Sequence, residues 1–195
     1  MHLRRETRNA MKELFEAIRA GELSRVSALV EADPSLAIFA AAILGSTEEI
    51  ERLLAGNRSL VSALSSDGWT PLHLAAYFGK KTAAQLLLNK GAPVNARSTN
   101  VMENTPLHAA AAGRHASIAR LLLDHGAQVD ARQHHGWTAL HAAAQNGDLE
   151  TAKALVDAGA DVKVRADNNQ SPLDLALTGA QQAMVDFLEA NGASL

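Results

Sequence analysis

The hexapeptide "GWTPLH" at 68–73 returns as "GWTALH" at 136–141, and related forms occur as "ENTPLH" at 103–108 and "NQSPLD" at 169–174. The tetrads that they share begin 35, 33 and 33 residues apart, at Thr70, Thr105, Thr138 and Ser171. A Gly-Ala pair follows 21 residues after the start of each tetrad, at Gly91, Gly126, Gly159 and Gly192. Two markers that keep one phase over four copies indicate a repeated structural unit.

Each copy predicts two helices joined by a turn. Thr and Ser are good N-caps, and proline suits the first helical position, where Pro71, Pro106 and Pro172 lie. A short Ala-rich inner helix follows, as in "LHLAAYF" (72–78), and then an outer helix with apolar residues at helical spacing, as in "ASIARLLLDHG" (116–126). The residues after the Gly-Ala pair are rich in turn formers, and they predict a hairpin-like finger.

The turn between the two helices differs among the copies. Gly79 and Gly147 stand where a left-handed cap is expected. In the other two copies the glycine comes one residue early, so Arg114 and Ala180 occupy that position. This shift predicts a different local form for those two turns.

The recurring histidines, His73, His108 and His141, stand at the third helical position, and Asp174 takes this place in the last copy. In a capping box this side chain bonds back to the N-cap, and the second nitrogen of an imidazole can bridge to the next unit. Replacement by aspartate suits a cap and does not suit a catalyst or metal ligand. We therefore predict that these histidines are structural.

Other chemistry has little support in the sequence. "HHGWTALH" (134–141) contains three histidines, but His134 and His135 would lie on a finger tip and diverge from His141. The chain has no cysteine and no phosphate-binding, dinucleotide or nucleophile-elbow motif. We predict no enzyme activity, no metal site and no cofactor; an enzyme or metal protein built on the three histidines is the rival hypothesis.

The repeat resembles the ankyrin repeat, a helix–turn–helix with a β-turn finger, a period of 33 and the signature T-P-L-H-x-A. The resemblance is specific for 67–195 and looser for 9–66, where the tetrad is missing and the 24 residues between Gly21 and Gly45 leave no room for a full finger. It implies an all-α solenoid with short β-hairpin fingers. One domain (1–195) would hold six units, at about 9–35, 36–66, 67–101, 102–134, 135–167 and 168–195.

Composition narrows the possible partners. The 195-residue chain has a formal net charge of −3, which gives no case for binding nucleic acid. The segment 1–21 reads as an amphipathic helix and not as a secretory signal, and no uncharged apolar stretch is long enough to span a bilayer. We expect a cytoplasmic monomer that binds neither nucleic acid nor membrane.

The resemblance implies a module that binds a partner protein or peptide on its concave face. Both tryptophans and the single tyrosine fall at positions that the family pattern leaves free, and these residue types often anchor interfaces. Structural packing is the alternative for the tryptophans, as it is for the recurring finger arginines. The candidate partner-binding residues are Trp69, Tyr77, Phe78, Asn104, His134, His135, Trp137, Gln145, Asn146, Arg97, Arg132 and Arg165. The alternative function is a self-assembling scaffold that uses its ends or convex helices.

Overall fold

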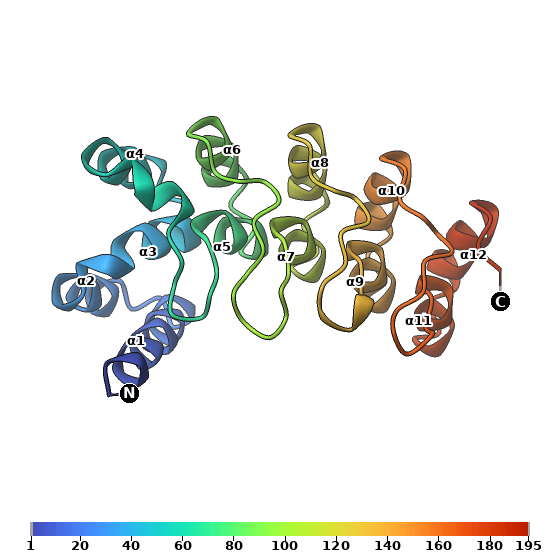
Figure 1. Cartoon of the computed structure of the whole chain (residues 1–195), viewed down its shortest axis with the longest axis horizontal. Helices are drawn as coiled ribbons and strands as arrows, with labels where there is room; N and C mark the ends of the chain where they lie inside the picture. Colours follow the sequence, from blue (N-terminus) through green and yellow to red (C-terminus); the bar gives the residue numbers. More distant parts are fainter. Residues whose placement is uncertain (1, 195) are drawn as a thin grey trace.

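The structure, a computed structural model, describes the backbone of residues 2–194 and the side chains of residues 10–194. Its twelve α-helices form six consecutive pairs, and this part of the chain contains no strand, which confirms the all-α prediction. Figure 1 shows the pairs in a row, with one layer of inner helices and one of outer helices. The pairs are α1 (His2–Arg19) and α2 (Leu23–Ala32), α3 (Ala37–Leu44) and α4 (Thr47–Gly56), α5 (Pro71–Tyr77) and α6 (Lys81–Asn89), α7 (Pro106–Ala112) and α8 (Ala116–Asp124), α9 (Ala139–Asn146) and α10 (Leu149–Asp157), and α11 (Pro172–Thr178) and α12 (Gln182–Ala190).

The inner helices begin with the predicted capping boxes. Thr70 Oγ1 accepts from the His73 amide, and His73 Nδ1 accepts from the Thr70 amide at 3.3 Å. His73 Nε2 lies 3.0 Å from the carbonyl oxygen of Asn104 in the next unit, and His108 and His141 repeat the pattern toward Trp137 and Gln170. A ring that accepts through Nδ1 and donates through Nε2 is a neutral imidazole. The predicted bridge between units is therefore present.

Burial keeps these imidazoles neutral. It lowers the pKa of His73 and of His108 to about 4, and it lowers the pKa of His141 in the same direction. In the last unit Asp174 Oδ2 accepts from the Ser171 amide at 2.8 Å, and this bond lowers the pKa of the Asp174 carboxyl. The tetrads therefore serve as helix starts in all four copies, with either an imidazole or a carboxylate as the cap.

The turns after the inner helices are alike in backbone form, so the prediction of two different forms was wrong. Gly79 and Gly147 have φ of 72° and 64°, and Arg114 and Ala180 adopt the same left-handed form with φ of 62° and 51°. A glycine is needed at position 113 for a steric reason, because a β-carbon on Gly113 would collide with the carbonyl oxygen of Tyr77 in the preceding unit. Close packing between units fixes that glycine, and the next residue carries the strain.

The fingers are loops that connect successive pairs and stack on one another. A backbone hydrogen bond closes each finger, from Ser65 to Trp69 and at the equivalent places in the others. In the second finger the bond runs from Ser98 to Asn104, two residues further along the chain, which places the two-residue insertion in this loop. Backbone bonds also join neighbouring fingers, such as Thr99 to Gly68 and His134 to Met102. The fingers thus have hairpin closure without strands.

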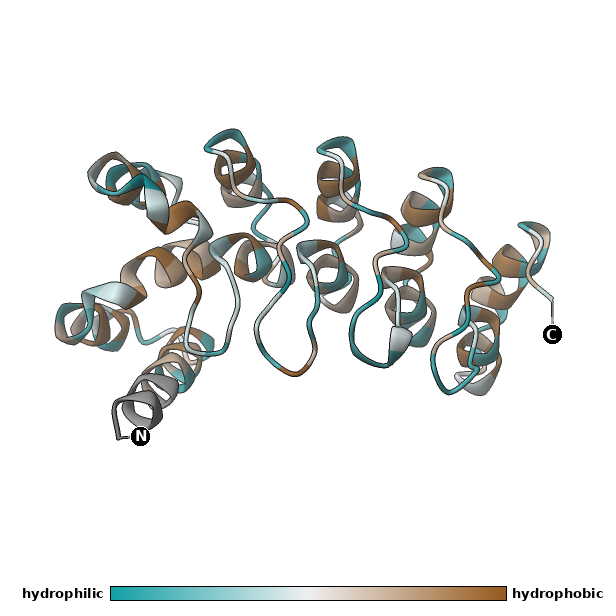
Figure 2. Cartoon of the chain, viewed as in Figure 1, coloured by the Kyte–Doolittle hydropathy of each residue, from teal (hydrophilic) through white to brown (hydrophobic). Residues whose placement is uncertain are grey.

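Small residues let the helices pack closely. The alanines in the middle of the inner helices are fully buried, among them Ala75, Ala76, Ala109, Ala110, Ala143 and Ala144. Leucines such as Leu72, Leu107 and Leu140 are buried in the same apolar core. Figure 2 shows apolar residues on the facing sides of the helices and hydrophilic ones at the outer turns and along much of the fingers. One continuous apolar core therefore runs along the solenoid.

The first helix departs from the simple stack. Helix α1 is 18 residues long and lies toward the side to which the fingers extend (Figure 1). Its Phe15 ring stacks on Phe78, two units along, with ring centroids 5.8 Å apart. Every residue from Ala37 to Ile43 of α3 is buried. The concave face is therefore covered at its N-terminal end.

Candidate functional site: an aromatic hollow on the concave face

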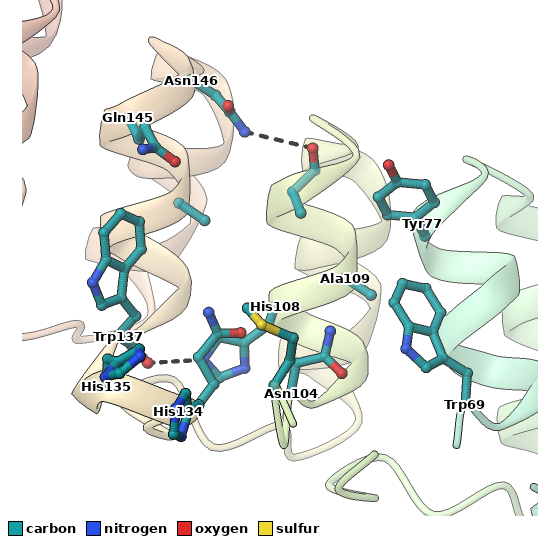
Figure 3. A pocket seen from close by; sticks show the side chains of 14 residues that line it. Trp69, Tyr77, Asn104, His108, Ala109, His134, His135, Trp137, Gln145 and Asn146 are labelled. Atoms are coloured by element: carbon teal, nitrogen blue, oxygen red, sulfur yellow. Dashed lines mark hydrogen bonds between the residues drawn. The ribbon is translucent and has the colours of Figure 1, made fainter. Parts of the chain in front are cut away.

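The fingers and the inner helices α5, α7 and α9 enclose a hollow of about 490 Å³ on the concave face. We call it the aromatic hollow. Figure 3 shows Trp69 and Tyr77 on one side, Trp137, Gln145 and Asn146 on the other, and His108 and Ala109 between them. Its remaining lining residues are Met102, Asn104, Ala112, Gln133, His134, His135 and Ala142.

Aromatic side chains form the walls of this hollow. Trp69 meets Tyr77 edge to face, with centroids 5.5 Å apart, and also lies against His73. Trp137 likewise lies against the capping histidine of its own unit, His141, with ring centroids 5.6 Å apart. Both tryptophans rest on the capping histidines of their own units and are partly exposed, and Tyr77 is 41% exposed. The tryptophans thus combine structural packing with an accessible face.

The lining of the aromatic hollow contains no aspartate, glutamate, lysine or arginine. His134 and His135 lie together on the finger tip, with ring centroids 3.9 Å apart. His141 is held away from them in its capping box, and no group of three or more potential metal ligands forms among residues 10–194. Asn146 Nδ2 approaches the carbonyl oxygens of Ala111 and Ala112 at the limit of hydrogen bonding.

Asn104 contributes differently through its backbone and its side chain. Its backbone amide donates to Ser98 Oγ at 3.0 Å, and its carbonyl oxygen accepts from His73 Nε2 at 3.0 Å. The side chain lines the hollow, the residue is only 8% exposed, and Oδ1 has no hydrogen-bond donor within residues 10–194. A buried acceptor of this kind is costly unless a donor reaches it.

The finger arginines lie outside the lining of this hollow and are already engaged. Arg97 is 3.3 Å from Glu103 and donates to the Arg132 carbonyl, and Arg132 in turn is 3.5 Å from Asp167 and donates to the Arg165 carbonyl. Arg165 donates to the Asn169 carbonyl and to Asp174. These contacts favour the structural alternative, and a binding role for the three arginines stays a prediction.

A second hollow, of about 470 Å³, lies on the other side of the Trp69–Tyr77 pair. We call it the α1 hollow, since Lys12, Phe15, Glu16 and Arg19 of α1 form one wall. Asp67, Trp69, Tyr77 and Phe78 complete its lining. Phe78, a candidate binding residue, thus belongs here and not to the aromatic hollow.

Eight of the twelve candidate residues meet around the aromatic hollow: Trp69, Tyr77, Asn104, His134, His135, Trp137, Gln145 and Asn146. Sequence reasoning missed Gln133 and Ala142, which no signal marked, and the α1 residues. Met102, another lining residue, belongs to the finger that holds the two-residue insertion. The positions left free by the repeat pattern were the informative signal.

Stacked helix pairs with a concave face built of fingers and inner helices define the class: a helical repeat solenoid. The chain belongs to the ankyrin-repeat family, because a family model described as "Ankyrin repeats (3 copies)" matches residues 14–98, 92–166 and 136–195. The resemblance predicted from the tetrads is thereby confirmed. Ankyrin repeats are generally protein–protein interaction modules and are typically non-catalytic.

Two curated relatives illustrate the similarity. Oxysterol-binding protein-related protein 1 of Rattus norvegicus is 48% identical over 60 residues, which is 26% of this chain and 6% of the relative. Ankyrin repeat and SAM domain-containing protein 6 of the same species is 34% identical over 98 residues, or 45% of this chain and 11% of the relative. The chain therefore spans only a small part of the length of these relatives. Within the described part of the chain, no helix combines the length and apolarity that a membrane span requires.

Proposed function

We propose that this chain is a non-catalytic interaction module that binds a partner protein or peptide in the aromatic hollow of its concave face. The observation that carries the proposal is the grouping of Trp69, Tyr77 and Trp137 around one uncovered hollow. Tryptophan and tyrosine dominate the energetic centres of protein interfaces. Tyr77 is 41% exposed, and both tryptophans stay partly exposed at this surface although they pack against the core.

The support for these side chains keeps the cost of binding low. The capping histidines hold the tryptophan rings from below, and the finger-to-finger hydrogen bonds fix the backbone around them. A preformed surface loses little conformational freedom when a partner binds. Binding in this hollow should therefore need no rearrangement of the solenoid.

The test is capture of partners by purified protein and by matched variants. Tyr77→Ala and Trp137→Ala remove aromatic walls of the hollow, whereas Phe187→Ala removes a partly buried aromatic of α12 that lies outside it. Circular dichroism establishes that all three remain folded. A partner retained by wild type and Phe187→Ala but lost with the other two supports the proposal. A partner bound equally by all the proteins refutes it.

A self-assembling scaffold is the second candidate, and a specific observation favours it. Leu23 of the first helix pair is 60% exposed and Leu177 of the last pair is 44% exposed, so each terminal pair carries an exposed apolar side chain. Contacts between these ends would generate head-to-tail chains. Sedimentation velocity over a range of concentrations distinguishes the candidates, since the interaction module should stay a monomer.

We further propose that the module acts in the cytoplasm and without a cofactor, nucleic acid or membrane. The absence of cysteine and the mixed charge of the surface motivate this proposal. Fractionation of source cells with an antibody against the chain tests the location. Recovery in an extracellular or membrane fraction would contradict it.

A further inference from the structure

The lining of the aromatic hollow contains no aspartate, glutamate, lysine or arginine, and this limits which partner side chains can bind there. Four charged residues of the fingers form ion pairs, Arg97 with Glu103 at 3.3 Å and Arg132 with Asp167 at 3.5 Å. A charged side chain that entered the hollow would lose its hydration without gaining a counter-ion. An uncharged apolar side chain would meet aromatic and aliphatic surface instead.

The inserted loop, residues 99–103, supplies an apolar contact at the edge of the hollow. Asn100 Oδ1 accepts from the Met102 amide at 2.9 Å, and Asn100 Nδ2 donates to the Asp67 carbonyl of the preceding finger. The Met102 carbonyl accepts from His134 of the following finger at 2.9 Å. The loop is thus fastened on both sides, with Met102 lining the hollow and Val101 outside it, 78% exposed.

A second, independent observation concerns hydrogen bonding. Two buried side-chain oxygens in residues 10–194 have no donor, Gln181 Oε1 and Asn104 Oδ1, and of the two only Asn104 lines the hollow. The side chain of Asn104 is therefore a buried acceptor beside an apolar surface. An N–H group next to an apolar anchor would satisfy it. Every residue of a polypeptide other than proline carries such an N–H group.

We propose that the aromatic hollow recognises an uncharged stretch of a partner polypeptide, with one large apolar side chain seated between Trp69, Met102 and Trp137 and an adjacent N–H donated to Asn104. The inference rests on the proposed function and specifies the chemistry of its partner. The Trp69–Tyr77 pair, which separates the hollow from the α1 hollow, limits the segment on that side. Met102 makes the inserted loop a specificity element of this site.

The experiment is selection of a displayed library of random peptides on the wild-type chain, followed by titration of synthetic winners by fluorescence anisotropy. Winners are expected to share a leucine, methionine or aromatic anchor whose neighbours are uncharged. Met102→Ala should weaken binding by about fivefold or more, and Val101→Ala, its neighbour in the same loop, by less than about twofold. A recurring acidic or basic anchor, equal effects of the two substitutions, or a failure to obtain peptides that depend on Trp137 overturns the proposal.

A charge placed at the rim provides the second arm. Ala112 lines the hollow and is exposed, so Ala112→Glu should fold and should weaken the selected peptides by about tenfold or more. Ala183→Glu, on an exposed position of α12, is the matched control and should leave affinity unchanged. Equal affinity of both variants overturns the uncharged-anchor proposal. Selected peptides with charged anchors that still require Trp137 would contradict this inference but not the proposed function. A natural partner that binds equally well to the Tyr77 and Trp137 variants would contradict the proposed function itself.

Discussion

The stability of this solenoid should fall steeply as the pH drops from 6.5 to 4, because of its capping histidines. His73 and His108 accept hydrogen bonds through Nδ1 and donate through Nε2, so protonation destroys the capping contact inside a buried site. Their pKa falls to about 4 in the folded chain, from an ordinary value of 6.5. The unfolded chain therefore binds protons over this range while the folded chain does not, and the free energy of unfolding declines with falling pH.

The size of the effect follows from the same values. Each pH unit between the folded and unfolded pKa values corresponds to about 1.4 kcal/mol for each group. Together the two histidines should remove about 6 kcal/mol of stability between pH 7 and pH 4. His141 adds to the loss in the same direction. The lowered pKa of Asp174 acts in a lower window, because its stabilisation is lost only as the pH falls below the ordinary carboxyl value of 3.8.

Urea titrations at intervals between pH 7 and pH 4 measure this dependence. The informative variant is His108→Gln, whose amide can still accept from the Thr105 backbone but does not titrate. The free energy of unfolding of this variant should depend less on pH than that of wild type. The two slopes should differ by about 1 kcal/mol per pH unit in the middle of the range. His134→Gln, on the exposed finger tip, controls for the loss of a histidine outside the capping boxes. A flat wild-type profile, or parallel profiles for wild type and His108→Gln, would refute the assignment of a neutral buried imidazole.

Three further predictions concern strain, packing and the buried acceptor. Ala180→Gly relieves a left-handed alanine and should raise the free energy of unfolding by about 0.5–1 kcal/mol in urea titrations, and a loss of stability would contradict the strain argument. Gly113→Ala drives a β-carbon against the Tyr77 carbonyl and should cost about 1–3 kcal/mol in the same assay, whereas Gly179→Ala meets only a side-chain amide and should cost less; equal costs would count against the packing explanation. Asn104→Ala removes an acceptor that has no donor, so the melting temperature of the free protein should hardly change while the affinity for selected peptides falls several-fold. A large drop in melting temperature would show that the amide serves the fold.

The repeated tetrads made most of the fold predictable. A cap, a first-turn proline and a glycine in fixed phase each have a local physical cause, so they locate helix starts and ends without tertiary information. The same logic identified the histidines as structural, since an aspartate can cap but cannot replace an imidazole in chemistry. It also located most of the aromatic hollow, because residues that the repeat does not need are available for binding.

Features that depend on tertiary contacts were not predictable in this way. The apolar spacing of α1 shows that one face is buried, but it does not show that Phe15 meets Phe78 two units away. The pairing of the finger arginines depends on the stacking distance between fingers and not on their own spacing in sequence. The prediction for the turn at Arg114 rested only on the low preference of arginine for a left-handed backbone, which the residue nevertheless adopts. Inter-unit packing overrides that preference, because Gly113 must approach the preceding unit closely.

The position of α1 also bears on why the proposed binding surface lies in the middle of the solenoid. In a simple solenoid each unit contacts only its neighbours, so a concave face would extend over all units. Here α1 lies toward the side to which the fingers extend, and its Phe15 stacks on Phe78, the residue that follows Tyr77. The Trp69–Tyr77 pair therefore has a hollow on each side, and it is supported through the contact of Tyr77 with Phe78. Rings fixed by their contacts with one another and with Phe78 lose little freedom when a partner covers them, which lowers the cost of the binding that we propose.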